Sequence, residues 1–305
     1  MKKIVLLLMA LLVMVYCYFG GFTTGDYVDG VEFNDEIVIP SDKRIIALGE
    51  ATHGNKEFQE LKLNIFKKLV EENGVRAFAI EGDFGGCLEV NDYIHGGSGS
   101  TLEAVKKIGF KIYQTKEMIE LIDYMRDYNL SHIDDDINFY GLYLKEIKRQ
   151  NKEVDNSLLR DKYMAQNIEW ILEREDKVFV CAHNEHVAKW GSYDSMGKLL
   201  SLKEENGYYV IGTDFYKSKC NLPFMGKRIV RTFYSHDPLT KSLKMSGKNV
   251  GIIYTSKLDV DYIYMGSLGE GFYLIPQSYR IFQPPKTMYD AMVLFVNVNP
   301  TVIIE

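Results

Sequence analysis

The sequence has little of what marks several common protein classes. It contains only 4 cysteines and 7 prolines in 305 residues, and no two cysteines form a C-x-x-C pair. This pattern argues against a disulfide framework, a zinc ribbon and a thioredoxin-type redox centre. The sequence also has no G-x-S-x-G, G-x-G-x-x-G or Walker motif. A serine hydrolase with a nucleophile elbow and the usual nucleotide-binding loops are therefore not expected.

The sequence also lacks an excess of positive charge. Lys+Arg number 36 and Asp+Glu number 42, so the formal net charge is 36 − 42 = −6 at pH 7. A protein that binds nucleic acid needs a basic surface to displace counterions, so no nucleic-acid partner is expected. The content of 46% hydrophobic and 26% charged residues is typical of a folded globular chain.

The first residues have the pattern of a targeting segment. Lys2 and Lys3 precede the uncharged apolar stretch 4–19, which is typical of an export signal and is nearly long enough to span a membrane. We expect residues 1–22 to be a signal peptide or an N-terminal membrane anchor, and residues 23–305 to form a single domain. This domain is expected to be exported, either extracellular or tethered through residues 4–19 and facing outside.

Apolar runs typical of buried strands alternate with segments of helical period. Strands are expected over residues 44–48, 75–80, 138–142, 177–182, 208–212, 250–254 and 291–296, and helices over 57–72, 115–128 and 158–173. This alternation predicts an α/β fold with a mostly parallel central sheet flanked by helices. Residues 220–290 have no pattern that can be assigned.

Four of the predicted strands are followed at once by acidic or imidazole side chains. These are Glu50 and His53 after 44–48, Glu81 after 75–80, His183 and His186 after 177–182, and Asp214 after 208–212. Ligands of parallel α/β sheets bind outside the carboxyl ends of the strands. If the first three strands are neighbours, their acids and imidazoles converge on one active-site pocket.

Such a cluster supports two kinds of hydrolysis. A neutral imidazole flanked by carboxylates can take a proton from water, and further histidines can donate hydrogen bonds to an oxyanion, which suits cleavage of an ester. A divalent metal is the rival use, because the His183-x-x-His186 pair with His53 and either Glu50 or Glu81 could hold zinc. The structural alternatives are a helix-entry motif at Glu50 and His53, and solvated polar loops elsewhere.

A series of motifs in order resembles the erythromycin esterase family, which includes succinoglycan-biosynthesis-like homologues. The motifs are Gly49-Glu50-Ala51-Thr52-His53-Gly54, Ile80-Glu81-Gly82-Asp83-Phe84, Phe139-Tyr140-Gly141-Leu142, Arg160-Asp161 with Met164-Ala165, and Ala182-His183-Asn184 followed by His186. The resemblance runs from about residue 40 to 300.

The resemblance implies a water-activating mechanism without a required cofactor. It makes His53 the general base, Glu50 and Glu81 its carboxylate partners, and His183 and His186 the rest of the polar site. The residues implied to bind substrate are Lys62, Asp83, Arg160 and Asn184. The implied substrate is a small-molecule ester or lactone, and the family's described activity is hydrolysis of macrolide lactones, which inactivates the antibiotic.

Three departures from the family pattern bear on the substrate. Lys62 stands where the family usually has Arg, and Tyr143 stands where Asp is common. Only residues 145–159 bridge two motifs that a long helical insertion usually separates, so a more open cleft is expected. Two alternatives therefore stay open, namely a metal-dependent hydrolase or peptidase that uses the same pocket, and a non-catalytic envelope protein that binds a polysaccharide or lipid fragment.

Overall fold

The computed structural model describes residues 8, 9, 11, 27–143, 157–191, 193–235, 237–260, 263–267 and 279–304. Most of the predicted targeting segment, residues 1–22, lies outside these ranges, as does most of the short bridge over residues 145–159. Within the described ranges, no helix has the length and hydrophobicity needed to cross a membrane.

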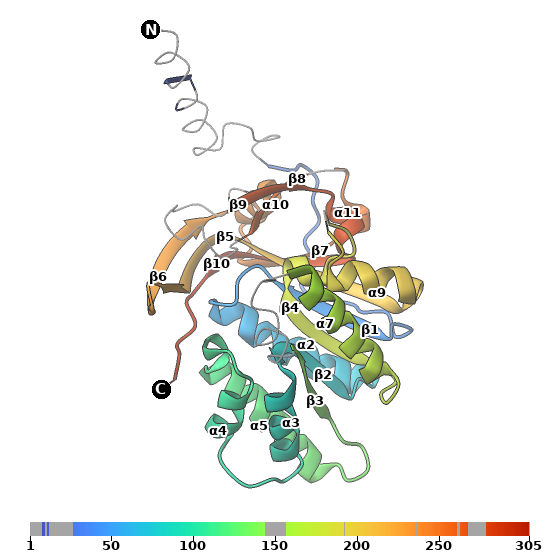
Figure 1. Ribbon diagram of the computed structural model, residues 1–305. Helices are drawn as coiled ribbons and strands as arrows, with labels where there is room; N and C mark the ends of the chain where they lie inside the picture. Colours follow the sequence, from blue (N-terminus) through green and yellow to red (C-terminus); the bar gives the residue numbers. More distant parts are fainter. Residues whose placement is uncertain are drawn as a thin grey trace.

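One large sheet forms the centre of the molecule (Figure 1). Its strands are β1 (Ile45–Glu50), β2 (Ala77–Asp83), β3 (Asn138–Tyr143), β4 (Val178–His183), β5 (Tyr208–Phe224), β6 (Lys227–Tyr234), β7 (Val250–Tyr254) and β10 (Ala291–Val298). The order is β3-β2-β4-β1-β5-β10-β7, with β6 paired to β5. All pairings are parallel except β10 with β7 and β5 with β6. A separate antiparallel pair is formed by β8 (Ile263–Ser267) and β9 (Tyr279–Gln283).

Helices cover both faces of this sheet. They are α2 (Lys56–Asn73), α3 (Phe84–Ile94), α4 (Thr101–Lys107), α5 (Lys116–Ser131), α7 (Ser157–Leu172), α8 (Asn184–Val187), α9 (Met196–Glu204), α10 (Pro238–Met245) and α11 (Pro285–Met288). Short 3-10 turns are η1 (Lys111–Tyr113), η2 (Glu205–Gly207) and η3 (Thr255–Lys257). The mostly parallel α/β fold predicted from the sequence is confirmed.

Successive strand residues enter two hydrophobic cores on opposite faces. In β1, Ile46 and Leu48 join the core under α2, α3 and α5, whereas Ile45 and Ala47 join the core under α7 and α9. This follows from the two-residue period of a strand, since neighbouring side chains point to opposite faces. A sheet buried on both faces has hydrophobic runs in place of strict alternation, which is why these strands could be located from the sequence.

Helix α2 leads directly away from the strand-end motif. Its buried residues Phe58, Ile65, Phe66 and Leu69 share one face of the helix. It ends at Gly74, whose φ of 66° is left-handed and whose N–H donates to the carbonyl of Leu69. A glycine at this position is a common C-terminal cap of a helix, because glycine adopts the left-handed conformation without a steric penalty.

The prediction that Asp214 follows a strand end is wrong. Strand β5 continues to Phe224 and pairs with β6, so Asp214 lies inside the strand, opposite Leu294 of β10. Its carboxylate is buried and accepts a hydrogen bond from the N–H of Phe215 at 2.7 Å. Asp214 therefore lies within the sheet and not at the carboxyl end of its strand.

Candidate active site

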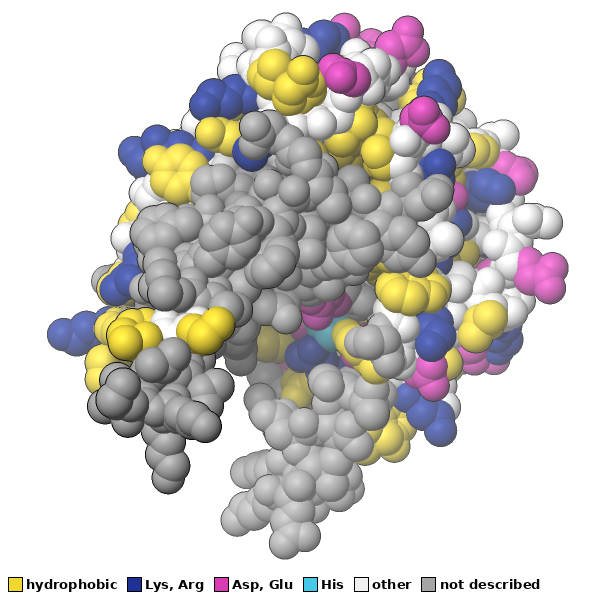
Figure 2. Space-filling model, turned by 90° about the horizontal axis from the view of Figure 1, so that it is seen from above, with side chains coloured by type: hydrophobic (Ala, Val, Ile, Leu, Met, Phe, Trp, Pro, Cys, Tyr) yellow, Lys and Arg dark blue, Asp and Glu magenta, His cyan; other side chains and the backbone are white. Residues whose placement is uncertain are grey.

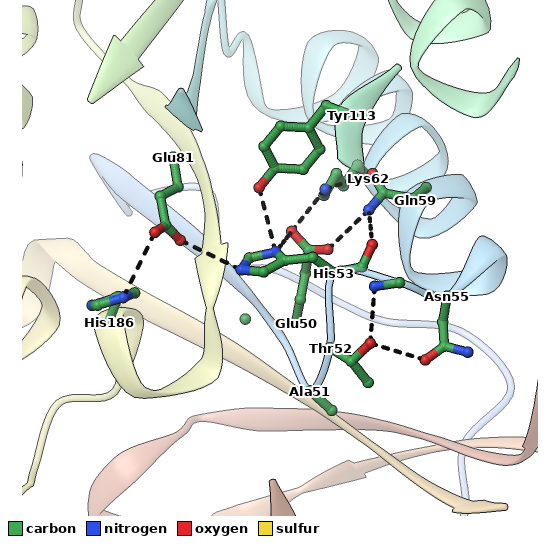
Figure 3. Close-up of polar contacts among 12 residues, drawn as sticks. Glu50, Ala51, Thr52, His53, Asn55, Gln59, Lys62, Glu81, Tyr113 and His186 are labelled. Carbon is green, nitrogen blue, oxygen red and sulfur yellow. Dashed lines mark hydrogen bonds and ion pairs between the residues drawn. The ribbon is translucent and has the colours of Figure 1, made fainter. Parts of the chain in front are cut away.

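Three neighbouring parallel strands bring the predicted site together. The order β2-β4-β1 places Glu50 opposite His183, and Ile80 opposite Cys181, with Glu81 one residue further along. The carboxyl ends of these strands therefore meet at one edge of the sheet. The five predicted site residues Glu50, His53, Glu81, His183 and His186 lie there as one cluster (Figure 3).

His53 lies between two carboxylates. Its Nδ1 is 3.5 Å from Oε1 of Glu50, and its Nε2 is 3.7 Å from Oε2 of Glu81. The hydroxyl of Tyr113 is 3.4 Å from the same Nδ1. Burial lowers the pKa of His53, but the negative charges of Glu50 and Glu81 outweigh it, so the net pKa is raised above its ordinary value of 6.5. The side chain is 29% exposed, so this basic imidazole is accessible from solvent.

Glu50 is fixed by a fully buried ion pair. Lys62 Nζ lies 2.7 Å from Oε1 of Glu50, and neither side chain has any exposed surface. Gln59 donates to Oε2 of Glu50 at 3.1 Å and to the carbonyl of His53 at 3.0 Å, and it accepts from Lys62 at 2.7 Å. Burial raises the pKa of Glu50, yet the charges of Lys62 and His53 lower it overall, so the carboxylate stays ionised.

This position of Lys62 does not agree with the predicted contact to substrate. Its ammonium is wholly buried, and it also lies over the ring of Tyr113 at 4.7 Å from the centroid. Lys62 therefore acts on Glu50 and on the wall of the site. The two charges of this ion pair depend on each other, because a buried carboxylate without a cation would be strongly destabilising.

Glu81 has its own cationic partners. Its Oε1 lies 3.5 Å from Nη1 of Arg160 and 3.8 Å from Nε2 of His186. Burial raises the pKa of Glu81, but the electrostatic interactions with His186, His53 and Arg160 lower it to about 2. Glu81 is therefore ionised at neutral pH.

The hydrogen bonds of His186 define its tautomer. Arg160 Nη2 lies 2.6 Å from Nε2 of His186, and Oδ1 of Asp161 lies 2.7 Å from Nδ1. A guanidinium can only donate, so Nε2 accepts from Arg160. The proton is then on Nδ1, which donates a hydrogen bond to Asp161. Asp161 is fully buried and also accepts from the N–H of Met196 at 3.0 Å. These two contacts hold the imidazole ring in a fixed orientation beside Arg160.

His183 is a neutral imidazole at the same edge. Its ring centroid is 5.5 Å from that of His53. Burial, together with the electrostatic interactions with His53 and His186, lowers the pKa of His183 to about 3. Its buried Nε2 has no hydrogen-bond partner within the described part of the chain, and the same is true of Nε of Arg160. Both atoms are polar groups of the site that no described residue satisfies.

Two further predicted substrate contacts have other surroundings. The amide of Asn184 donates to the carbonyl of Thr213 at 2.8 Å and accepts from its N–H at 3.2 Å, so it links the carboxyl end of β4 to the interior of β5. Asp83 lies at the end of β2, before α3. Neither side chain is among the described residues that line the cavity, so a structural role suits Asn184 better than contact with a ligand.

A tightly packed turn sets the position of His53. Thr52 accepts from the N–H of Gly54 at 2.9 Å, and Asn55 donates to the carbonyls of Lys219 and Asn299 at 2.8 and 3.0 Å. A side chain at Gly54 would place its Cβ 2.3 Å from the carbonyl oxygen of Asn221. Glycine is therefore required there, because the backbones of the turn and of β5 are in direct contact.

A cavity of about 280 Å³ opens beside this cluster. The lining residues are Thr52, His53, Gly54, Glu81, Phe110, Lys111, Ile112, Tyr113, Arg160, Asn221, Leu222, Pro223 and Arg228. On the face shown in Figure 2, a histidine side chain lies in a hollow beside basic and acidic side chains, which agrees with this polar lining. The cavity thus gives a small molecule access to His53, Glu81 and Arg160.

The donor set is poorly suited to a metal ion. Within the residues that the structure describes, no group of three or more His, Cys, Asp or Glu side chains is placed to hold one. Lys62 at Glu50 and Arg160 at Glu81 and His186 already put fixed positive charges where a divalent cation would bind. A metal centre would have to displace both cations, at a large electrostatic cost.

Sequence reasoning missed three residues that complete the site. Gln59 and Asp161 hold Glu50 and His186 in place, and Tyr113 contacts His53 from η1. Gln59 lies three residues before Lys62, which puts both on one face of α2, so the spacing carried a usable signal. Asp161 stood inside a motif already noted. Nothing in the sequence connects Tyr113 with His53, since they are sixty residues apart.

Comparison with known sequences identifies relatives of part of the chain. The sequence model of the erythromycin esterase family matches residues 70–156 and 143–232. The putative hydrolase YbfO of Bacillus subtilis (strain 168) is 33% identical over 86 residues, which are 28% of this chain and 19% of that protein. Erythromycin esterase type II of Escherichia coli is 30% identical over 104 residues, which are 34% of this chain and 24% of that protein. The chain thus spans about a fifth to a quarter of these curated relatives.

Solved structures share the fold over most of the chain. A succinoglycan biosynthesis protein superposes with a TM-score of 0.72 at 20% identity, covering 86% of this chain and 90% of that one. A mutant of the erythromycin esterase EreC in its open conformation gives a TM-score of 0.66 at 12% identity, covering 87% and 93%. At these identities the superpositions report on the fold. Together with the family match over residues 70–232, which is more than half of the sequence, they show that this chain belongs to the erythromycin esterase family.

Proposed function

We propose that this protein hydrolyses an ester or lactone, with His53 as the general base that activates water. Membership of the erythromycin esterase family supports a hydrolase. The observation that carries the finer proposal is the imidazole of His53, which lies between two ionised, buried carboxylates and is still accessible from the cavity. A base in this setting has a raised proton affinity and keeps a fixed orientation.

The reaction follows from these contacts. With a proton on Nδ1 directed at Glu50, Nε2 of His53 carries the lone pair and takes a proton from a water molecule in the cavity. The oxygen of that water forms the new bond to the carbonyl carbon, and the carbonyl oxygen becomes an oxyanion. His53 then returns the proton to the leaving alkoxide as the ester bond breaks, which yields an acid and an alcohol. Glu50 and Glu81 stabilise the imidazolium in between.

Arg160 is the proposed partner of the oxyanion. Its guanidinium lines the cavity, its buried Nε has no hydrogen-bond partner among the described residues, and His186 holds its Nη2. A donor that is already oriented before the reaction stabilises developing negative charge without further reorganisation.

The size of the cavity favours a small substrate. Sites for drug-sized molecules usually have about 300–1,000 Å³, whereas the described walls enclose about 280 Å³. Macrolide inactivation is therefore the less favoured form of the proposal. A macrolide still belongs in the assay, because the Escherichia coli relative is named an erythromycin esterase.

The test is an ester and lactone screen with purified wild-type protein and the variants His53→Ala and Glu81→Gln. We expect turnover by the wild type and a loss of at least about a hundredfold in kcat for each variant. Circular dichroism and thermal melting check that the variants fold. Unchanged hydrolysis by both folded variants would reject the proposed mechanism.

The alternatives predict different results. A metal-dependent hydrolase would contain a stoichiometric ion after purification without chelators, and would lose it in a His183→Ala/His186→Ala variant. A non-catalytic envelope protein would bind a ligand saturably but hydrolyse no ester, lactone or amide. The proposal keeps an exported or membrane-tethered location, which the lysines and apolar stretch of residues 1–22 support.

A further inference from the structure

Among the described residues that line the cavity beside His53, positive side chains outnumber negative ones. Its described lining includes Lys111, Arg160 and Arg228, and Glu81 as the carboxylate. Glu81 is already paired with Arg160, so the negative charge of this carboxylate is balanced by the guanidinium. Lys111 and Arg228 add positive charge to the same cavity, in a protein whose formal net charge is −6. A cationic cleft in an acidic protein concentrates anions at that place.

Lys111 lies on the same short turn as a residue that contacts His53, and no described residue pairs with its ammonium. It begins η1, and the same short turn carries Tyr113, whose hydroxyl contacts Nδ1 of His53. The side chain of Lys111 is exposed, and its ammonium has no hydrogen bond or ion pair with any other described residue. It is therefore a compact positive charge available to a ligand in the cavity.

Arg228 reaches the cavity from a separate element, the β5–β6 hairpin. Its Nε donates to Oδ1 of Asn221 and its Nη2 donates to the carbonyl of Asn221, both at 2.7 Å. These two bonds hold the guanidinium against the hairpin, at the wall of the cavity.

We infer that the substrate carries a negatively charged group, a carboxylate or a phosphate, beside an apolar body, and that Lys111 binds this group. The apolar body would contact Phe110, Ile112 and Leu222, which line the same cavity. This inference rests on the proposed ester hydrolysis, because it places the anionic group relative to an ester at His53. It makes Lys111 a determinant of substrate specificity.

The experiment compares three p-nitrophenyl esters with acyl chains of similar length. These are the neutral pentanoate, the anionic monoglutarate and the cationic 4-(trimethylammonio)butyrate. At low salt we expect kcat/KM for the monoglutarate to exceed that for the pentanoate by about tenfold, with the cationic ester lowest. Added salt should reduce this preference, because ions screen exposed charges.

Lys111→Gln should lower the ratio of kcat/KM for the monoglutarate over the pentanoate by about fivefold. The matched control is Lys106→Gln, which removes the same charge from an exposed position on α4 outside the described lining. The control should keep the wild-type ratio. A ratio that falls equally in both variants would mean that only the net charge matters, and would overturn the assignment of Lys111.

The two proposals fail in different ways. Equal kcat/KM for the neutral and anionic esters would overturn the anion site and leave ester hydrolysis standing. If no ester is hydrolysed, the proposed function fails, and calorimetric titration with glutarate tests the anion site directly. Binding that Lys111→Gln weakens and Lys106→Gln does not would support the site. No measurable binding of glutarate to the wild type would overturn it.

Discussion

The substitution Lys62→Met tests whether the buried ion pair holds the candidate active site together. Lys62 Nζ lies 2.7 Å from Glu50, and both side chains are fully buried. At an effective dielectric constant of about 20, Coulomb's law gives an attraction of about 6 kcal/mol at this distance. The desolvation of both ions offsets most of that attraction. Methionine has a similar volume, so the substitution removes the charge with little change in packing.

The expected loss of stability comes from the acid that remains. Without Lys62, Glu50 stays buried beside Gln59 and His53, and breaking a buried pair in this way costs about 3–5 kcal/mol. Because about 1 kcal/mol shifts the melting temperature of a large domain by roughly 2–4 °C, a fall of about 6–20 °C is expected. The double variant Glu50→Gln/Lys62→Met leaves no charge unpaired and should recover at least half of the loss.

Urea denaturation and differential scanning calorimetry measure both quantities. The control is Lys68→Met on the same helix, which breaks a surface pair of 2.8 Å with Glu72. Exposed pairs of this kind contribute about 0–1 kcal/mol. If Lys62→Met costs no more than this control, or if the double variant is no more stable than the single one, the reasoning about the buried pair is wrong.

Three further predictions concern the base and its supports. The pKa of His53 is raised above 6.5, so kcat/KM should rise with pH through a value above 6.5 as the imidazole loses its proton. Glu81→Gln should move this rising part of the pH profile to lower pH. A pH profile that does not move would contradict the role of Glu81. Gly54→Ala should cost about 1–3 kcal/mol in urea denaturation, because its Cβ would lie 2.3 Å from the carbonyl oxygen of Asn221; wild-type stability would show that this turn adapts. Asp161→Asn should lower kcat at least about tenfold, because an amide no longer fixes the tautomer of the imidazole it orients; stopped-flow or steady-state ester assays with unchanged kcat would count against this role.

Much of the central sheet could be predicted from the sequence. Its strands are buried on both faces and so appear as short apolar runs between helical segments. Glu50, Glu81 and His183 lie together, as the strand pattern predicts, because the carboxyl ends of neighbouring parallel strands meet at one edge; their function as a site stays a prediction. That β4 lies between β1 and β2 could not be derived, since the order of strands depends on helix crossovers and not on the strands themselves.

The failures have equally local causes. Strand β5 was predicted to stop near residue 212 because its apolar run ends there, yet it continues as a long hairpin arm whose partner is β6. Polar residues are tolerated in that arm, because an antiparallel pair can expose one face to solvent. Asp214 was misplaced because the apolar run ends before it, although the strand continues past it. Tyr113 was missed because a contact between η1 and the turn at His53 depends on packing between distant segments.

The contacts of Glu50 show how a lysine at position 62 suffices where an arginine could also pair with it. A guanidinium would offer two parallel donors to the two oxygens of a carboxylate, whereas an ammonium is a point charge. Here Lys62 contacts Oε1 at 2.7 Å and Gln59 donates to Oε2 at 3.1 Å. The two side chains are three residues apart on α2 and bond to each other at 2.7 Å. Together they supply both donors, so Glu50 keeps a fixed orientation beside His53 with a lysine at position 62.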